Sequence, residues 1–271
     1  MDVVLAAMTD CPYRGSVAAF AGTFAAALEG RVRVVTAFRA PGVEGGSRPR
    51  TATEAREPML AAAEVAAERE VRAAMVEPGV GVEGDWVLEP AVATYLREVA
   101  RCDFGVIGKT LTGPLPPGRG LGRDVQQLKR SSTKPLIIVP EGAPALRSVL
   151  FIYTGHAESG HGLSLAVPLA KAGVSIVLAT MVHPLTPGDL EGAGSAYLAE
   201  HRISHHHVKS DCAHCMTDGG PVAEVLHLVQ QECVDLVVMG GTRHGLLGRL
   251  LWPEMAHDVA WNLAVPLLIW Y

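Results

Sequence analysis

The chain has 271 residues, of which 49% are apolar and 19% charged, and its formal net charge is −5. This length suits two domains, each large enough for its own core. The acidic balance argues against a nucleic-acid partner. No apolar run reaches the ~20 residues that span a bilayer, and residues 1–30 show no signal peptide. Because five cysteines fit a reducing compartment better than a disulfide framework, we expect a cytoplasmic protein without a membrane or nucleic-acid partner.

Apolar runs alternate with helical patterns along the first half of the chain, which predicts a parallel, doubly wound α/β sheet. Loops are expected over 40–50 and 109–121, and a turn over 78–84. The predicted strands are 3–8, 32–38, 71–76, 104–107 and 136–139, and the predicted helices are 14–29, 53–70, 88–100 and 122–132.

The second half repeats this plan. Residues 203–209 are polar and are predicted to form an edge strand. The other predicted strands are 149–153, 174–180, 236–239 and 267–270, and the predicted helices are 159–172 (capped by Gly173), 189–200, 221–232 and a last one that opens at Pro253-Glu254 and ends before Val265-Pro266.

One strand unit occurs twice. Cys102-Asp-Phe-Gly-Val-Ile-Gly108 parallels Val234-Asp-Leu-Val-Val-Met-Gly240, and Thr133–Val139 parallels Ala264–Trp270. The two copies lie about 130 residues apart, which is far too long for a solenoid repeat. The repeat therefore predicts two domains, residues 1–144 and 145–271.

Residues 234–270 resemble the C-terminal half of a universal stress protein domain. That family carries a G-x2-G-x9-G-[ST] signature between a VDLIVMG-like and a CPVLVV-like strand. The resemblance implies two tandem five-stranded parallel-sheet domains, adenine-nucleotide α-hydrolase-like, each of strand order 3-2-1-4-5. It also implies that 136–139 and 267–270, the fifth strands through which family members often dimerise, meet as an intramolecular pseudo-dimer. A further homodimer stays open.

The ATP-binding branch of this family implies a nucleotide site in the first half. There an Asp after the first strand reaches ribose and metal, main chain after the second strand meets adenine, and a glycine loop with the following helix N-terminus holds the phosphates. Leu111 departs from this pattern by replacing a signature glycine. Arg123 replaces the small hydroxyl residue, and it can either pair with a phosphate or fill its place. The matching residues for ATP, with or without Mg²⁺, are Thr9, Asp10, Ala37, Gly108, Gly120, Gly122 and Arg123.

The second half departs further from the ATP-binding pattern. Thr154-Gly155 replaces the Thr-Asp pair, and Arg243, Pro253 and Glu254 replace the phosphate-binding residues. Glu254 would repel a phosphate, so we expect a structural role for this half. No nucleophile–base pair is legible, so no catalytic residue is predicted and slow ATP hydrolysis is the most we expect of it as an enzyme.

Histidines and cysteines gather in residues 205–215. His205 and His207 point the same way on a strand, and Cys212 and Cys215 have C-x2-C spacing. These four residues can be read as a zinc shell. They can also be read as a Cys212–Cys215 redox pair, or, as we prefer, as an edge strand with incidental histidines. We therefore expect a non-catalytic stress-response protein whose first half binds ATP or a related adenine nucleotide. The alternatives are a nucleotide-free interaction dimer and a metal or redox sensor.

Overall fold

The computed structural model describes residues 2–7, 12–37, 69, 73, 81–87, 91–111, 120–155, 157–181, 190–209, 220–240 and 255–271. Several residues singled out in the sequence lie outside these ranges: Thr9, Asp10, Cys212, Cys215, Arg243, Pro253 and Glu254.

The first half alternates strands and helices. Its first helix buries Val17, Phe20 and Phe24. It ends where Glu29 takes a positive φ of 52° and the Gly30 N–H donates to the Ala25 carbonyl at 2.8 Å, a helix-terminating geometry. The elements are β1 (Val3–Ala7), α1 (Arg14–Ala27), β2 (Arg31–Ala37), β3 (Val82–Val87), α3 (Ala91–Val99), β4 (Phe104–Gly108), α4 (Arg123–Ser131) and β5 (Leu136–Val139).

The second half follows the same order of strands. Its strands are short apolar runs that are almost fully buried, except β8, which carries three histidines. The elements are β6 (Ser148–Tyr153), α5 (Ala157–Leu163), α6 (Ala166–Lys171), β7 (Ser175–Thr180), α7 (Leu190–Glu200), β8 (His205–Lys209), α8 (Gly220–Glu232), β9 (Leu236–Gly240), α10 (Met255–Asn262) and β10 (Leu267–Trp270).

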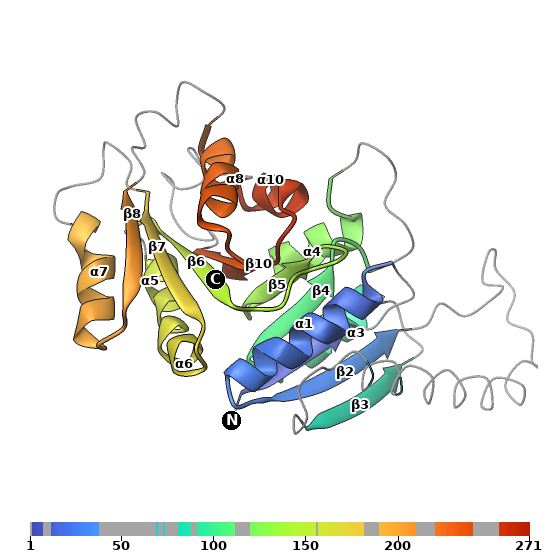
Figure 1. Cartoon of the computed structure of the whole chain (residues 1–271). Helices are drawn as coiled ribbons and strands as arrows, with labels where there is room; N and C mark the ends of the chain where they lie inside the picture. The colour runs from blue at the N-terminus through green and yellow to red at the C-terminus, as the bar shows by residue number, and fades with distance from the viewer. Residues whose placement is uncertain are drawn as a thin grey trace, which may run out of the picture.

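The described strands form one ten-stranded sheet in the order β3-β2-β1-β4-β5-β10-β9-β6-β7-β8 (Figure 1). Each half by itself has the expected parallel order 3-2-1-4-5, and β8 lies at the sheet edge as predicted. The two fifth strands, β5 and β10, pair antiparallel, with Leu267 opposite Ile138 and Ile269 opposite Leu136. The mostly parallel α/β fold is confirmed. The two halves share one continuous sheet.

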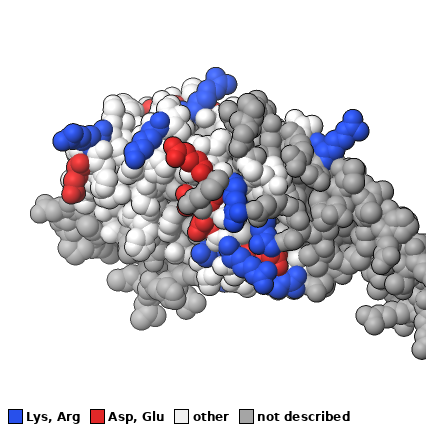
Figure 2. All heavy atoms as spheres, turned by 90° about the horizontal axis from the view of Figure 1, so that it is seen from below, with Lys and Arg blue, Asp and Glu red and all other residues white. Residues whose placement is uncertain are grey.

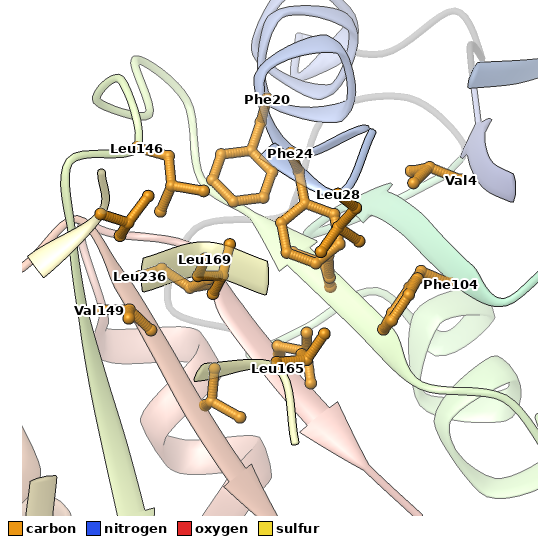
Figure 3. Packing of buried hydrophobic residues seen from close by; sticks show 14 of the residues in the cluster. Val4, Phe20, Phe24, Leu28, Phe104, Leu146, Val149, Leu165, Leu169 and Leu236 are labelled. Atoms are coloured by element: carbon orange, nitrogen blue, oxygen red, sulfur yellow. The ribbon is translucent and has the colours of Figure 1, made fainter. Parts of the chain in front are cut away.

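The two faces of this sheet carry separate layers of helices. Helices α1, α5, α6 and α7 bury side chains on one face, and α3, α4, α8 and α10 bury theirs on the other. The first layer crosses between the halves: Figure 3 shows Phe20 and Phe24 of α1 close to Leu146 and Leu169. Because apolar burial is continuous across the middle of the sheet, the two halves stabilise one another. None of the helices in the described ranges is long and apolar enough to cross a membrane.

Three sequence predictions were wrong, and one of them is the turn predicted over 78–84, which overlaps β3. The third strand is β3, not 71–76: Ala73 is helical, and residues 82–87 pair in register with β2. Gly84 and Asp85 disfavour a strand by propensity, but this pairing overrides it. The helix predicted over 159–172 is two helices, because Pro168 has no N–H to donate to the Ser164 carbonyl, and the second of them ends at Lys171.

Charged side chains are mixed in sign on the surface. Figure 2 shows the underside of the molecule, where Lys and Arg lie among Asp and Glu. One carboxylate, that of Glu98, is buried, with 4% of the residue exposed. It forms ion pairs with three arginines: Arg33 at 3.0 Å, Arg97 at 3.1 Å and Arg101 at 3.4 Å. These guanidinium groups offset the desolvation of Glu98 and tie α3 to β2.

Candidate nucleotide site

The order of strands reverses at β1, which pairs with β2 on one side and β4 on the other. In open parallel sheets, ligands bind outside the carboxyl ends of the strands at such a point. Ala37, predicted to face adenine, is the last residue of β2 and pairs with Val87 of β3. Gly108 is the last residue of β4. The structure thus places both at the same edge of the sheet.

Gly108 packs directly against the start of α1. A Cβ atom added at Gly108 would lie 2.5 Å from the Cβ of Tyr13, the residue that precedes α1. No side chain fits there unless the helix moves. The missing side chain at this position therefore has a packing reason, close approach of β4 and α1, that does not depend on a ligand.

The loop after β4 returns to the same edge at the N-terminus of α4. Gly122 is the N-cap residue, and its N–H donates to the Lys109 carbonyl at 2.9 Å. Arg123 is the first helical residue, and its side chain is exposed. Of the predicted phosphate-binding residues, Gly122 and Arg123 therefore lie at a helix N-terminus, where an anion is favoured.

A carboxylate of the chain itself already lies at this N-terminus. Asp124 accepts a hydrogen bond from the Leu111 N–H at 2.8 Å through Oδ2 and from the Val125 N–H at 2.8 Å through Oδ1. The buried Thr110 hydroxyl also donates to Asp124, at 3.5 Å. A Cβ at Gly122 would collide with Asp124 Oδ1. The glycine thus makes room for the Asp124 side chain.

Gly120, the remaining loop glycine in the predicted site, faces the second half. A Cβ there would lie 2.7 Å from His257 Nε2 on α10. Lys109 makes a second such contact, because its ammonium group donates to the carbonyls of Trp261 at 2.6 Å and Leu263 at 2.9 Å, at the end of α10. The loop of the first half is therefore held against a helix of the second.

Lys109 is 9% exposed, and its ammonium lies 5.6 Å from the centre of the Trp261 ring. Burial lowers the pKa of this lysine from 10.5 to about 8. Lys109 places a positive charge at the C-terminus of α10, where the last carbonyl groups of a helix attract cations. The lysine side chain is directed at the end of α10.

At the matching edge of the second half, the chain hydrogen-bonds to itself. The Thr154 N–H donates to the Ser159 hydroxyl at 3.3 Å. Thr180, at the end of β7, is hydrogen-bonded to His207 Nε2 at 2.9 Å. Both hydroxyl side chains, Ser159 and Thr180, are buried. These bonds join β6 to α5 and β7 to β8.

His205 and His207 share one face of β8, with ring centres 6.5 Å apart. Their ring nitrogens have protein partners: His205 Nδ1 lies 3.2 Å from the Ile203 carbonyl and its Nε2 lies 3.4 Å from the Ser195 hydroxyl. Within the described ranges, no three His, Cys, Asp or Glu side chains gather to hold a metal ion. The other two predicted ligands, Cys212 and Cys215, lie outside those ranges.

Lys109 and Asp124 were not identified from the sequence as site residues. An acidic residue in a first helical turn is a signal for an occupied helix N-terminus, and Asp124 follows the predicted start of the helix by two residues. No local pattern indicates the role of Lys109, because its partners Trp261 and Leu263 lie in the other half of the chain.

Comparison with protein families gives a match to the universal stress protein family over residues 145–270. A comparison with curated proteins gives no match.

Solved structures share the fold over the whole chain. A universal stress protein from Archaeoglobus fulgidus is similar at a TM-score of 0.72 and 13% identity, covering 99% of this chain and 95% of that one. A protein of unknown function from Pseudomonas aeruginosa PAO1 covers 100% and 92% at a TM-score of 0.60 and 15% identity. A universal stress protein from Pseudomonas aeruginosa UCBPP-PA14 covers 100% and 93% at 0.60 and 16%. At these identities the likeness concerns the fold.

Proposed function

We propose, from the match of residues 145–270 to the universal stress protein family, that the first half of the chain binds an adenine nucleoside or nucleotide at the carboxyl edge of β1, β2 and β4. The second half serves as a structural partner. The protein has a non-catalytic role in which the bound ligand acts as a signal.

One observation carries this proposal: β2 ends at Ala37 and β4 ends at Gly108 at the edge where the strand order reverses, and the loop after β4 leads to Gly122 and Arg123 at the N-terminus of α4. Fold physics favours ligand binding at that edge. Arg123 is exposed there and offers a charged, bidentate donor. Thr9 and Asp10, which follow β1 in the sequence, complete the proposed site as its ribose- or metal-facing residues.

The structural role of the second half is supported by its contacts. β10 pairs with β5, and Trp270 stacks edge-on against Phe104 at 5.8 Å between ring centres. Lys109 and Gly120 hold the first-half loop on α10. We propose that this arrangement is an intramolecular equivalent of a dimer, in which the second half holds the first-half loop in place.

Thermal unfolding with adenosine, AMP, ADP and ATP, each with and without Mg²⁺, tests ligand binding. A ligand at ~100 times its dissociation constant adds about 2.7 kcal/mol, which for this size raises the midpoint by roughly 5 °C or more. Asp10→Ala should abolish the shift. Thr154→Ala, which alters the second-half residue that matches Thr9, should leave it unchanged. If no adenine compound shifts the midpoint, the protein is a nucleotide-free interaction partner.

A zinc site is a second candidate, supported by the shared face of His205 and His207 on β8. With thiolates from Cys212 and Cys215 it would have four ligands of the kinds zinc prefers. Metal analysis of untagged protein should then give about one zinc per chain. His207→Ala and Cys212→Ser should each lose it, and His206→Ala, which alters the opposite face of the strand, should keep it. Metal-free wild-type protein would exclude this site.

A further inference from the structure

Asp124 holds a negative charge at the place in the first half where a helix N-terminus would otherwise attract a phosphate. Its two carboxylate oxygens accept from Leu111 N–H and Val125 N–H, each at 2.8 Å. Backbone N–H groups of a loop and of a helix's first turn are the donors that commonly bind phosphate. Here Asp124 takes two of them.

The neighbouring contacts keep Asp124 in this position. The Gly122 N–H is bonded to the Lys109 carbonyl, and Gln126 Nε2 donates to the Leu121 carbonyl at 2.8 Å. Leu111 and Leu121 on either side of the loop are each 2% exposed. A phosphate that replaced the carboxylate would have to break the Asp124 bonds or reorganise a loop anchored by buried side chains.

We propose that Asp124 is a specificity-determining residue, which restricts the ligand of the first half to an adenine nucleoside or a nucleoside monophosphate and rejects the di- and triphosphates. This inference rests on the proposed function. The carboxylate excludes the distal phosphates in two ways. It occupies the Leu111 and Val125 N–H groups that would bind them, and it repels their negative charge. In this proposal the adenine and ribose bind at the ends of β1 and β2, whereas Asp124 bonds to the Leu111 and Val125 N–H groups at the start of α4.

The test compares adenosine, AMP, ADP and ATP by isothermal titration with wild-type protein, Asp124→Asn and Asp124→Ser. Asn keeps the shape of Asp without its charge, and Ser keeps a small hydrogen-bonding group at a helix start. Far-UV circular dichroism and the unliganded melting midpoint establish that each variant is folded. The matched control is Asp258→Asn, which neutralises the acidic residue in the first turn of α10.

Wild-type protein should bind AMP at least roughly tenfold more tightly than ATP, a free-energy difference of about 1.4 kcal/mol. Asp124→Asn or Asp124→Ser should strengthen ATP binding by roughly tenfold or more and leave adenosine within about twofold. Asp258→Asn should behave as wild type.

Three other outcomes would overturn the inference, and they are distinguishable. If no compound binds wild type or either variant, the proposed function fails and the inference fails with it. If ATP binds wild type as tightly as AMP, and the Asp124 variants do not change it, the nucleotide site stands but Asp124 has no part in selectivity. If Mg²⁺ is required for ATP and the Asp124 variants weaken its binding, Asp124 serves a metal-bound triphosphate instead of excluding it.

Discussion

The ammonium group of Lys109, which follows β4 in the first half, lies 2.6 Å from the backbone carbonyl of Trp261 in the last helix of the second half. The same nitrogen donates to Leu263 at 2.9 Å, so one side chain caps the C-terminus of α10. The backbone carbonyl of Lys109 also accepts a hydrogen bond from the Gly122 N–H. Lys109 thus links the candidate ligand loop to the other half. At the matching position of the sequence the second half has Gly241, which carries no side chain.

Replacing Lys109 by Met should destabilise the protein by about 1–3 kcal/mol, because the part-buried carbonyl of Trp261 and the buried carbonyl of Leu263 lose a charged donor while the apolar stem is kept. Urea unfolding followed by tryptophan fluorescence measures this change. Lys171→Met, an exposed lysine in the last turn of α6, is the matched control and should change stability by less than about 0.5 kcal/mol. Equal effects of the two substitutions would show that Lys109 contributes no more than a surface charge.

The stability of wild-type protein should rise with pH, relative to Lys109→Met, between pH 8 and pH 10.5. Burial lowers the pKa of Lys109 to about 8 in the folded protein, against 10.5 for an unperturbed lysine. In this interval the unfolded chain binds more protons, so raising the pH favours the folded state. Below pH 8 the lysine is protonated in both states and the difference is constant. Urea midpoints of both proteins across this range measure the effect, and a difference that stays flat or falls would contradict it.

Gly108→Ala should destabilise the protein by about 1–3 kcal/mol, because its Cβ would lie 2.5 Å from Tyr13 Cβ and the start of α1 must shift to accept it. Gly142→Ala is a poor control because Gly142 has a positive φ. Gly160→Ala, which meets open space, is suitable and should be neutral or slightly stabilising. If the folded Gly108→Ala protein still binds ligand, the glycine is needed for packing and not for binding.

The two Asp residues that precede the fourth strands should differ in their contribution to stability. Asp235 accepts from the N–H groups of Arg147 and Ser148, each at 3.0 Å, and from the Ser148 hydroxyl at 3.1 Å. Asp103 accepts from the Val3 N–H at 2.9 Å. Each therefore fixes the start of the first strand of its own half. Asp235→Ala should destabilise by about 2–3 kcal/mol and Asp103→Ala by about 1 kcal/mol, as judged by chemical unfolding. The reverse order would show that these bonds do not set the difference.

The repeat could be read from the sequence because it rests on local patterns. The Asp-apolar-Gly units ending at Gly108 and Gly240, and the apolar runs 136–139 and 267–270, predict strands wherever they occur. Residues 82–87 could not be found in this way, because Gly84 and Asp85 disfavour a strand and only the hydrogen-bonded neighbour β2 makes them one. The glycines of the candidate loop were also legible in the sequence. The sequence did not show which neighbouring residues occupy the space that these glycines leave. They are Tyr13 at Gly108, His257 at Gly120 and Asp124 at Gly122.

The sequence by itself determined the alternation of strands and helices and the strand order within each half, because local periodicity and the family resemblance specify these. The family resemblance implied that strands 136–139 and 267–270 meet, and the tertiary structure decided how they do so: they pair antiparallel within one sheet, with Ile138 opposite Leu267. The tertiary structure also decided that Lys109 caps a helix of the other half and that Asp124 occupies the donors of its own loop. A hydrogen bond depends on distance and direction in space, and neither follows from residue order until the chain is folded.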